Sequence, residues 1–326
     1  MRTTTVAGRT WHYSHYLGRQ TAEHNESQFG STGGYMYPMD VAFGDGDVLF
    51  AVSRGWGYGL EGYIGDIGCR IGKTTIDEHH LGDFSRAGLT WPAGLAVAAD
   101  GNVYCSDEHE CRISVFDPDA TFPFPEGKPG EEALSAWGVK GSAPGQLDGP
   151  SGLAFDPNDN LYVVDSRNNR VQLFTKDGQF LDGWGRYGAG EGELSRPWGI
   201  TVDAHGDVYV ADWGNSRIQK FSADGRYLMS FGGGQSGSGA LDHPAGVAVD
   251  NDGDVFELSR AGLYNLNRDP ESIKILNRID DVMPILGAFL RPTGIAIDEQ
   301  DRIVVTDARS RLLVYVKDRE YVEPPI

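Results

Sequence analysis

The stretch Pro150–Phe174, PSGLAFDPNDNLYVVDSRNNRVQLF, contains three short runs of small, β-branched and aromatic residues separated by polar turns. The runs are SGLAF, NLYVVD and RVQLF. Asp-Pro-Asn-Asp-Asn separates the first two runs and Ser-Arg-Asn-Asn the last two. The residues of the second of these turns tolerate left-handed backbone and bond to their own turn. The pattern therefore predicts three consecutive short strands.

The same 25-residue frame recurs along the chain. Close copies begin at Pro197 (PWGITVDAHGDVYVADWGNSRIQKF) and at Pro92 (PAGLAVAADGNVYCSDEHECRISVF). Looser copies begin at Pro38, Pro244 and Pro292, which makes six frames whose prolines are 54, 58, 47, 47 and 48 residues apart. A repeat at such a period is typical of an array of identical structural units.

A fourth strand follows each complete frame. TKDGQFLDGWG comes after Phe174 and SADGRYLMSFG after Phe221, and each contains an Asp-Gly turn followed by a short aromatic-rich run. Four antiparallel strands in about 47 residues correspond to one propeller blade. The sequence thus predicts an all-β fold, a six-bladed β-propeller of four-stranded antiparallel blades.

The two chain ends indicate how this ring closes. The sixth frame stops after its third strand, while residues 10–20 (TWHYSHYLGRQ) precede the first frame. We expect this N-terminal stretch to complete the last blade, because a closed ring leaves no open sheet edge. Residues 1–326 are predicted to form one propeller domain, with frames starting at Pro38, Pro92, Pro150, Pro197, Pro244 and Pro292.

Composition limits the function classes. The net charge of −19 argues against nucleic acid and against an anionic membrane, because both would repel the chain. The N-terminus lacks the apolar core of a secretion signal. Three cysteines, Cys69, Cys105 and Cys111, suggest no disulfide framework. Reduced thiols and a cytoplasmic location are the expectation.

The frame Pro-x-Gly-Ile/Val-x-Val-Asp-x-x-Gly-Asp-Val-Tyr-Val-x-Asp-x-x-Asn-x-Arg-Ile/Val-Gln resembles the NHL repeat, and Pro197–Phe221 matches it nearly throughout. The resemblance implies a six-bladed propeller. It implies less about function, since NHL propellers include protein-binding and RNA-binding domains, sensor domains and a peptidyl-hydroxyglycine amidating lyase, and one scaffold hosts unrelated activities.

Resemblance to the amidating lyase would imply a zinc ion held by histidines between the proline and the glycine of three frames. Those positions hold no histidine here and are occupied by Met39, Ala93, Ser151, Trp198, Ala245 and Thr293. The sequence therefore predicts no such zinc site. No nucleotide or redox cofactor motif is present. The Asp-x-x-Gly-Asp runs at 203–207 and 250–254 resemble calcium loops but are expected to be turns. The sequence therefore allows a bound divalent metal such as calcium but contains no motif that supports one.

Positions that repeat in most frames are expected to be structural. In most frames an aspartate ends the second strand, and in most an arginine begins the third, which predicts ion pairs that fix this hairpin within a blade. The residues concerned are Asp107, Asp165, Asp212 and Asp307, with Arg70, Arg112, Arg170 and Arg217.

Positions that depart from the frame are the candidates for function. Asp40 replaces the glycine of the first frame, and Glu257 occupies an inter-blade slot that is apolar in the other frames. A carboxylate there must be paired or neutral, because burying it charged costs several kcal/mol. Arg54, Arg260 and Arg309 follow the second strands of consecutive blades, so all five side chains are expected on one side of one rim.

These residues predict a small-molecule site. Glu257 and Asp40 would transfer a proton, while Arg54, Arg260 and Arg309 would hold an anionic group. Trp56 and Tyr58, from an insertion that overhangs the same rim, and Trp213 complete the predicted substrate-binding set. The predicted function is a lyase, hydrolase or isomerase acting on a small anionic molecule. The alternatives are degenerate repeats with solvated charges, and a non-catalytic platform that binds a protein through rim aromatics.

Overall fold

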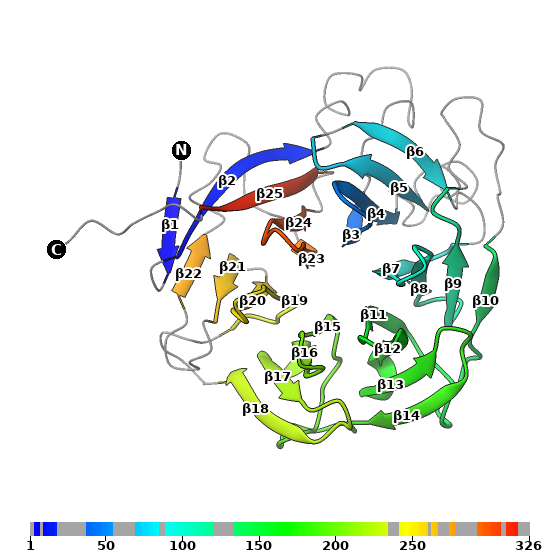
Figure 1. The fold of residues 1–326 in the computed structure, drawn as a ribbon. Coiled ribbons are helices and arrows are strands. Elements are labelled where there is room, and N and C mark those ends of the chain that lie inside the picture. The colour runs from blue at the N-terminus through cyan, green and yellow to red at the C-terminus, as the bar shows by residue number, and fades with distance from the viewer. Residues whose placement is uncertain are drawn as a thin grey trace.

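The computed structural model describes residues 3–6, 9–17, 37–54, 69–77, 79–84, 89–119, 133–233, 241–259, 262–266, 274–277, 292–307 and 311–318. In these segments the strands form antiparallel sheets arranged in a ring around a central axis (Figure 1). The first strand of each frame lies innermost and successive strands lie further out.

Five sheets are four-stranded blades. Blades one and two contain β3 (Pro38–Phe43), β4 (Val48–Arg54), β5 (Cys69–Thr75) and β6 (His80–Phe84), and then β7 (Pro92–Val97), β8 (Val103–Asp107), β9 (Arg112–Phe116) and β10 (Ser135–Trp137). Blades three and four contain β11 (Pro150–Phe155), β12 (Asn160–Asp165), β13 (Arg170–Thr175) and β14 (Phe180–Trp184), and then β15 (Ile200–Val202), β16 (Val208–Asp212), β17 (Arg217–Phe221) and β18 (Tyr227–Gly232). Blade five contains β19 (Gly246–Val249), β20 (Val255–Ser259), β21 (Gly262–Asn265) and β22 (Lys274–Asn277).

The sheet that closes the ring differs from the other five. It holds β23 (Pro292–Ile297), β24 (Ile303–Asp307) and β25 (Arg311–Asp318) from the C-terminal frame, followed by β2 (Arg9–Leu17) and β1 (Thr3–Val6). Strand β2 pairs along β25 from Thr10↔Asp318 to Leu17↔Leu312, and Figure 1 shows the two strands side by side. We call this five-stranded sheet the closing sheet.

The prediction of six four-stranded blades is therefore wrong, because the described part of the chain has five four-stranded blades. The N-terminal segment does add a strand beside the last frame, but that strand spans 9–17 rather than 10–20, and a further strand continues the sheet. This fifth strand of the closing sheet forms because the β-branched side chains of Thr3–Val6, TTTV, favour extended backbone. It pairs with β2 from Thr3↔His12 to Val6↔Arg9.

The frame fixes the register of the hairpin between the second and third strands. Asp165 lies opposite Arg170 and Asp212 opposite Arg217. In both blades the arginine Nε donates to the aspartate Oδ2 at 2.8 Å, and the carboxylate is fully buried. The predicted hairpin ion pair is confirmed in these two blades.

The core lies between the faces of successive sheets. Phe50, Val52 and Ile71 of blade one pack with Leu95 and Cys105 of blade two in one buried cluster. Another cluster joins blade five to the closing sheet through Trp11, Phe256, Ile303 and Leu313. Such face-to-face packing lets each sheet bury both surfaces, which is the source of stability of this architecture.

Two short 3-10 turns carry side chains to one rim of the ring. η1 (Ser166–Asn168) follows β12 and η2 (Trp213–Asn215) follows β16. Each ends at a residue with left-handed backbone, Asn169 at φ 55° and Ser216 at φ 53°. No helix in the described segments has the length and hydropathy needed to cross a membrane.

The Pro-x-Gly corner brings neighbouring first strands into backbone contact. The amide of Gly152 donates to the carbonyl of Trp198 at 2.9 Å. A Cβ on Gly152 would lie 2.6 Å from that carbonyl oxygen, and a Cβ on Gly199 would lie 2.5 Å from the carbonyl oxygen of Ala245. Glycine is required here because the next strand occupies the space of a side chain.

Candidate functional site

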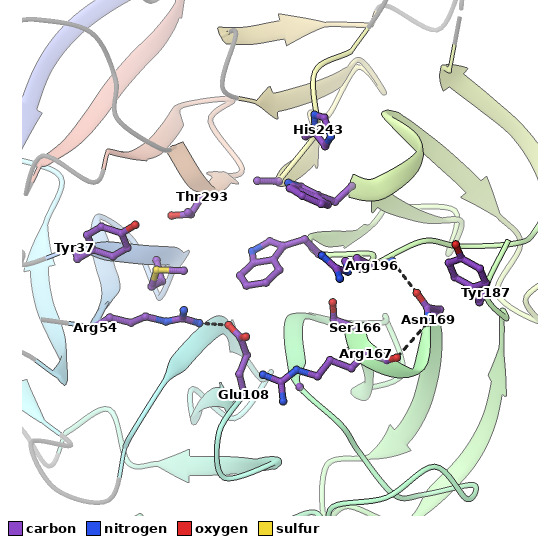
Figure 2. A pocket seen from close by; sticks show the side chains of 15 residues that line it. Tyr37, Arg54, Glu108, Ser166, Arg167, Asn169, Tyr187, Arg196, His243 and Thr293 are labelled. Atoms are coloured by element: carbon purple, nitrogen blue, oxygen red, sulfur yellow. Dashed lines mark hydrogen bonds and ion pairs between the residues drawn. The ribbon is translucent and has the colours of Figure 1, made fainter. Parts of the chain in front are cut away.

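A pocket of about 610 Å³ lies on the rim formed by the links that precede the first strands and follow the second strands. Tyr37, Gly149, Arg196 and His243 each come directly before a corner proline, while Arg54, Glu108, Ser166 and Trp213 end or follow second strands. We call this cavity the rim pocket; Figure 2 shows its lining side chains pointing inward from several sheets.

The residues before the corner prolines are held in an unusual backbone conformation. Tyr37, Gly149, Arg196 and His243 have φ angles of 55°, 63°, 47° and 55°. For the three residues with a side chain this left-handed geometry costs roughly 1–2 kcal/mol each. Strain of this kind is retained where the surrounding structure enforces it, commonly at functional sites.

The arginines of the rim pocket differ in their partners. Arg54 Nε donates to the carbonyl of Pro92 at 2.7 Å, and its guanidinium pairs with Glu108. Arg167 Nη1 lies 3.3 Å from Asp148 Oδ1. Arg196 makes no ion pair with any residue that the structure describes. Its backbone N–H donates to Asn169 Oδ1 at 2.8 Å, as Figure 2 shows.

A histidine and a tryptophan form another wall of the rim pocket. Nδ1 of His243 lies 2.7 Å from Oδ1 of Asp242, so the carboxylate orients the imidazole and leaves Nε2 for another partner. The ring centroids of Trp213 and His243 are 4.6 Å apart. Trp213 was predicted as a substrate-binding residue, and the structure places it in the pocket lining.

Trp198 forms the floor of the rim pocket. It begins the first strand region of blade four, yet it packs on the buried cluster of blades one and two that includes Met39 and Leu95. Its side chain therefore extends across the axis. Below it lies a second cavity of about 320 Å³, the axial channel, lined by the first strands; Trp198, Ala245 and Thr293 line both cavities.

Asp40 lines the axial channel and not the rim pocket. Its Oδ2 accepts the N–H of Leu95 at 2.9 Å, which joins blade one to blade two. Burial raises the pKa of Asp40 from 3.8 to about 7, and this rise outweighs the opposite effect of the hydrogen bonds from the N–H groups of Leu95 and Val41. Near neutral pH this carboxyl group can therefore either donate or accept a proton.

Glu257 is fully buried within blade five, opposite Val247 and Tyr264 in the neighbouring strands. Neither carboxylate oxygen has a partner in hydrogen-bond geometry among the described residues. Burial raises the pKa of Glu257 well above 4.5, while the nearby Ser259 hydroxyl lowers it and Asp242 raises it. Glu257 lines neither the rim pocket nor the axial channel, and its catalytic role stays a prediction.

Of the predicted site residues, the structure brings Arg54 and Trp213 together in the rim pocket and places Asp40 beyond its floor. Trp56, Tyr58, Arg260 and Arg309 lie outside the described residues. In the segments that are described, no three His, Cys, Asp or Glu side chains group as a metal site requires.

Sequence reasoning did not predict the following residues as pocket residues: Tyr37, Glu108, Arg167, Arg196, Trp198 and His243. The position before the corner proline carried a signal. In the six frames this position holds Tyr37, Trp91, Gly149, Arg196, His243 and Arg291. The residue type therefore varies from frame to frame, although the proline that follows it is the same in all six.

A ring of antiparallel sheets around an axis, with a ligand-sized pocket on one rim, defines this protein as a β-propeller. The model of the NHL repeat matches residues 147–174 and 194–221. The chain therefore contains NHL repeats, and the recognition of that repeat in the sequence is confirmed.

Solved structures share this fold at low identity. Virginiamycin B lyase from Staphylococcus aureus, in a catalytically inactive form with quinupristin, is 12% identical with a TM-score of 0.57, over 87% of this chain and 96% of the lyase. A streptogramin B lyase is 10% identical with a TM-score of 0.58, over 90% and 97%. A Bacteroides thetaiotaomicron protein is 18% identical with a TM-score of 0.62, over 87% and 70%. No curated protein matches the chain.

Proposed function

We propose that this protein binds a small anionic molecule in the rim pocket and acts on it as a lyase-type enzyme. The observation that supports this most is the combination, in one pocket of about 610 Å³, of three guanidinium groups with a histidine oriented by a carboxylate. Pockets of 300–1,000 Å³ are the usual size of small-molecule sites. Similarity of fold to two proteins named as lyases makes this class the first to test.

The charge of the rim pocket supports an anionic ligand. The whole chain has a net charge of −19, but the described lining carries Arg54, Arg167 and Arg196 against the single carboxylate of Glu108. Guanidinium groups bind carboxylates and phosphates through paired hydrogen bonds, and a concave site concentrates their field.

The chemistry of an elimination assigns a role to each group. His243 Nε2 accepts a proton from the carbon next to the substrate's carboxyl carbon, and the bond to the leaving group breaks as a carbon–carbon double bond forms. Asp242 holds the imidazole and stabilises its positive charge. An arginine stabilises the negative charge that develops on the substrate's carboxylate. Asp40 and Glu257, the acid–base candidates predicted from sequence, are proposed as alternative proton-transfer groups.

Single substitutions separate these assignments. The test substrates are small carboxylates that carry a leaving group two carbons from the carboxyl carbon, and mass spectrometry detects the unsaturated product. His243→Gln should lower turnover by about 10²- to 10⁴-fold without loss of binding. His205→Gln, an exposed histidine in a turn of blade four, is the matched control. Asp40→Asn and Glu257→Gln are measured in parallel.

The proposal is wrong if the wild-type protein binds none of these carboxylates and releases no unsaturated product. If product forms but only Glu257→Gln or Asp40→Asn abolishes it, the lyase assignment stands and His243 loses its role. Equal activity of His243→Gln and His205→Gln would likewise remove His243 from the reaction.

A further inference from the structure

The cations of the rim pocket are not equally available to a ligand. The guanidinium of Arg54 is occupied by Glu108 and by the carbonyl of Pro92. That of Arg167 lies 3.3 Å from the Asp148 carboxylate. A ligand that bound either arginine would have to displace an existing partner, which offsets much of the gain.

Arg196 has no such partner among the described residues, and its backbone is fixed. Its backbone is left-handed, with a φ of 47°, and Asn169 Oδ1 accepts its N–H at 2.8 Å. Asn169 also donates from Nδ2 to the carbonyl of Arg167 at 3.1 Å, so one amide ties both arginine positions together (Figure 2). The base of the Arg196 side chain is thereby held in place before a ligand arrives.

Aromatic surface lies in the same cavity. Trp198 forms the floor, and Trp213, whose ring centroid lies 4.6 Å from that of His243 in a tilted arrangement, forms a wall. Flat apolar rings of this kind bind an aromatic group by burial and by stacking, each contact contributing beyond its area alone.

Resting on the function proposed above, we infer that the substrate is an arylalkyl carboxylate, an aliphatic carboxylate bearing an aromatic group, whose carboxylate binds Arg196 and whose ring lies against Trp198 and Trp213. A purely aliphatic acid would leave the two indoles in contact with water. An aromatic amine would place its positive charge beside an unpaired guanidinium. A site that requires both a carboxylate and an aromatic ring therefore selects against aliphatic acids and against aromatic amines.

Calorimetric titration with 2-naphthylacetate, acetate and 2-naphthylethylamine tests this inference. The wild-type protein should bind 2-naphthylacetate at least tenfold more tightly than either other probe. Arg196→Gln should weaken that binding by about 10- to 100-fold, because a charge-assisted hydrogen bond is lost. Arg196→Lys should fall between, and Trp213→Leu should weaken binding about three- to tenfold.

Three controls make the result specific. Arg167→Gln changes the same residue type in the same pocket and should weaken binding less than Arg196→Gln does, because Arg167 already has a partner. Arg186→Gln changes an arginine whose side chain is 81% exposed and outside the pocket lining, and should leave the affinity unchanged. Thermal denaturation of each variant confirms that the fold is intact.

The possible failures are distinguishable. If carboxylates bind but Arg196→Gln and Arg167→Gln weaken their binding equally, or acetate binds as tightly as 2-naphthylacetate, the arylalkyl carboxylate inference is overturned and the proposed function remains. If no carboxylate binds to the wild-type protein at all, both are overturned.

Discussion

Nε of Arg217 donates to Oδ2 of Asp212 at 2.8 Å, and the same oxygen also accepts from the side chains of Asn215 and Gln219 at 2.8 and 3.1 Å. The other oxygen of Asp212 accepts the N–H of Ser195 at 2.7 Å. Blade three repeats the arrangement around Asp165. One buried carboxylate thus joins its own hairpin to the link that enters the blade.

Asp212→Ala should lower the free energy of unfolding by about 3–5 kcal/mol, because it leaves a mostly buried guanidinium and several N–H groups without an acceptor. Urea denaturation measures the change. Arg186→Ala, which removes an exposed ion pair to Glu193, should change the free energy by less than about 0.5 kcal/mol. Equal effects of the two substitutions would show that the Asp212 network does not stabilise the blade.

This hairpin network was predictable because it recurs. An aspartate and an arginine at fixed places in several frames can be read as partners without coordinates, and their register follows from the strand period. The closing strand β2 was also predictable, since the last frame lacks its fourth strand. Strand β1 was not, because four residues with no place in the frame carry no repeat signal.

The rim pocket was less predictable, because side-chain direction at a corner depends on φ. Nothing in the identity of Arg196 or His243 shows that the backbone is left-handed there, since most residues avoid that region. Glu257 and Asp40 were singled out as departures from the frame and expected at one rim. In the structure Glu257 is buried in blade five and Asp40 lies along the axial channel, and the frame alone does not separate these two depths.

Asp40 should make stability depend on pH. Its pKa is about 7 in the folded protein and 3.8 ordinarily, so the folded state holds the proton more tightly. The stabilisation from that proton is complete below about pH 4 and is lost as the pH rises to about 7. Asp40→Asn keeps an acceptor for the Leu95 N–H but does not titrate.

We therefore expect Asp40→Asn and wild type to have similar stability at pH 4, and the variant to be more stable at pH 8 by about 2–4 kcal/mol. Asp40 is only partly buried, which will reduce the difference toward the lower figure. Denaturation curves across this pH range provide the measurement. A difference between the two proteins that stays constant from pH 4 to 8 would contradict the raised pKa.

Gly152→Ala should destabilise the ring by about 2 kcal/mol, because the new methyl group would lie 2.6 Å from the Trp198 carbonyl oxygen and the backbone of blade four would have to move. Gly206→Ala is the contrasting variant. That glycine has a φ of 83° but no atom within 4 Å of the Cβ position, so only backbone strain of about 1 kcal/mol opposes alanine. In thermal denaturation, Gly152→Ala should lower the melting temperature more than Gly206→Ala does. A larger decrease for Gly206→Ala would show that the inner strands can move apart without cost.

The seam between the two chain ends depends on Trp11. Its ring is 2% exposed, meets Phe256 of blade five edge-on at 5.3 Å and lies 5.2 Å below the ammonium of Lys317. That ammonium also contacts Asp250, Asp252 and Asp301 at 2.6–3.0 Å, so strand β25 is held to the neighbouring blade through charge and β2 through apolar packing. Trp11→Ala should cost about 3–5 kcal/mol and weaken the pairing of β2 with β25. Hydrogen exchange of the β25 amides should then accelerate more than that of β16 in blade four. If β16 and β25 accelerate equally, the ring opens as one unit and the seam is not its weakest point.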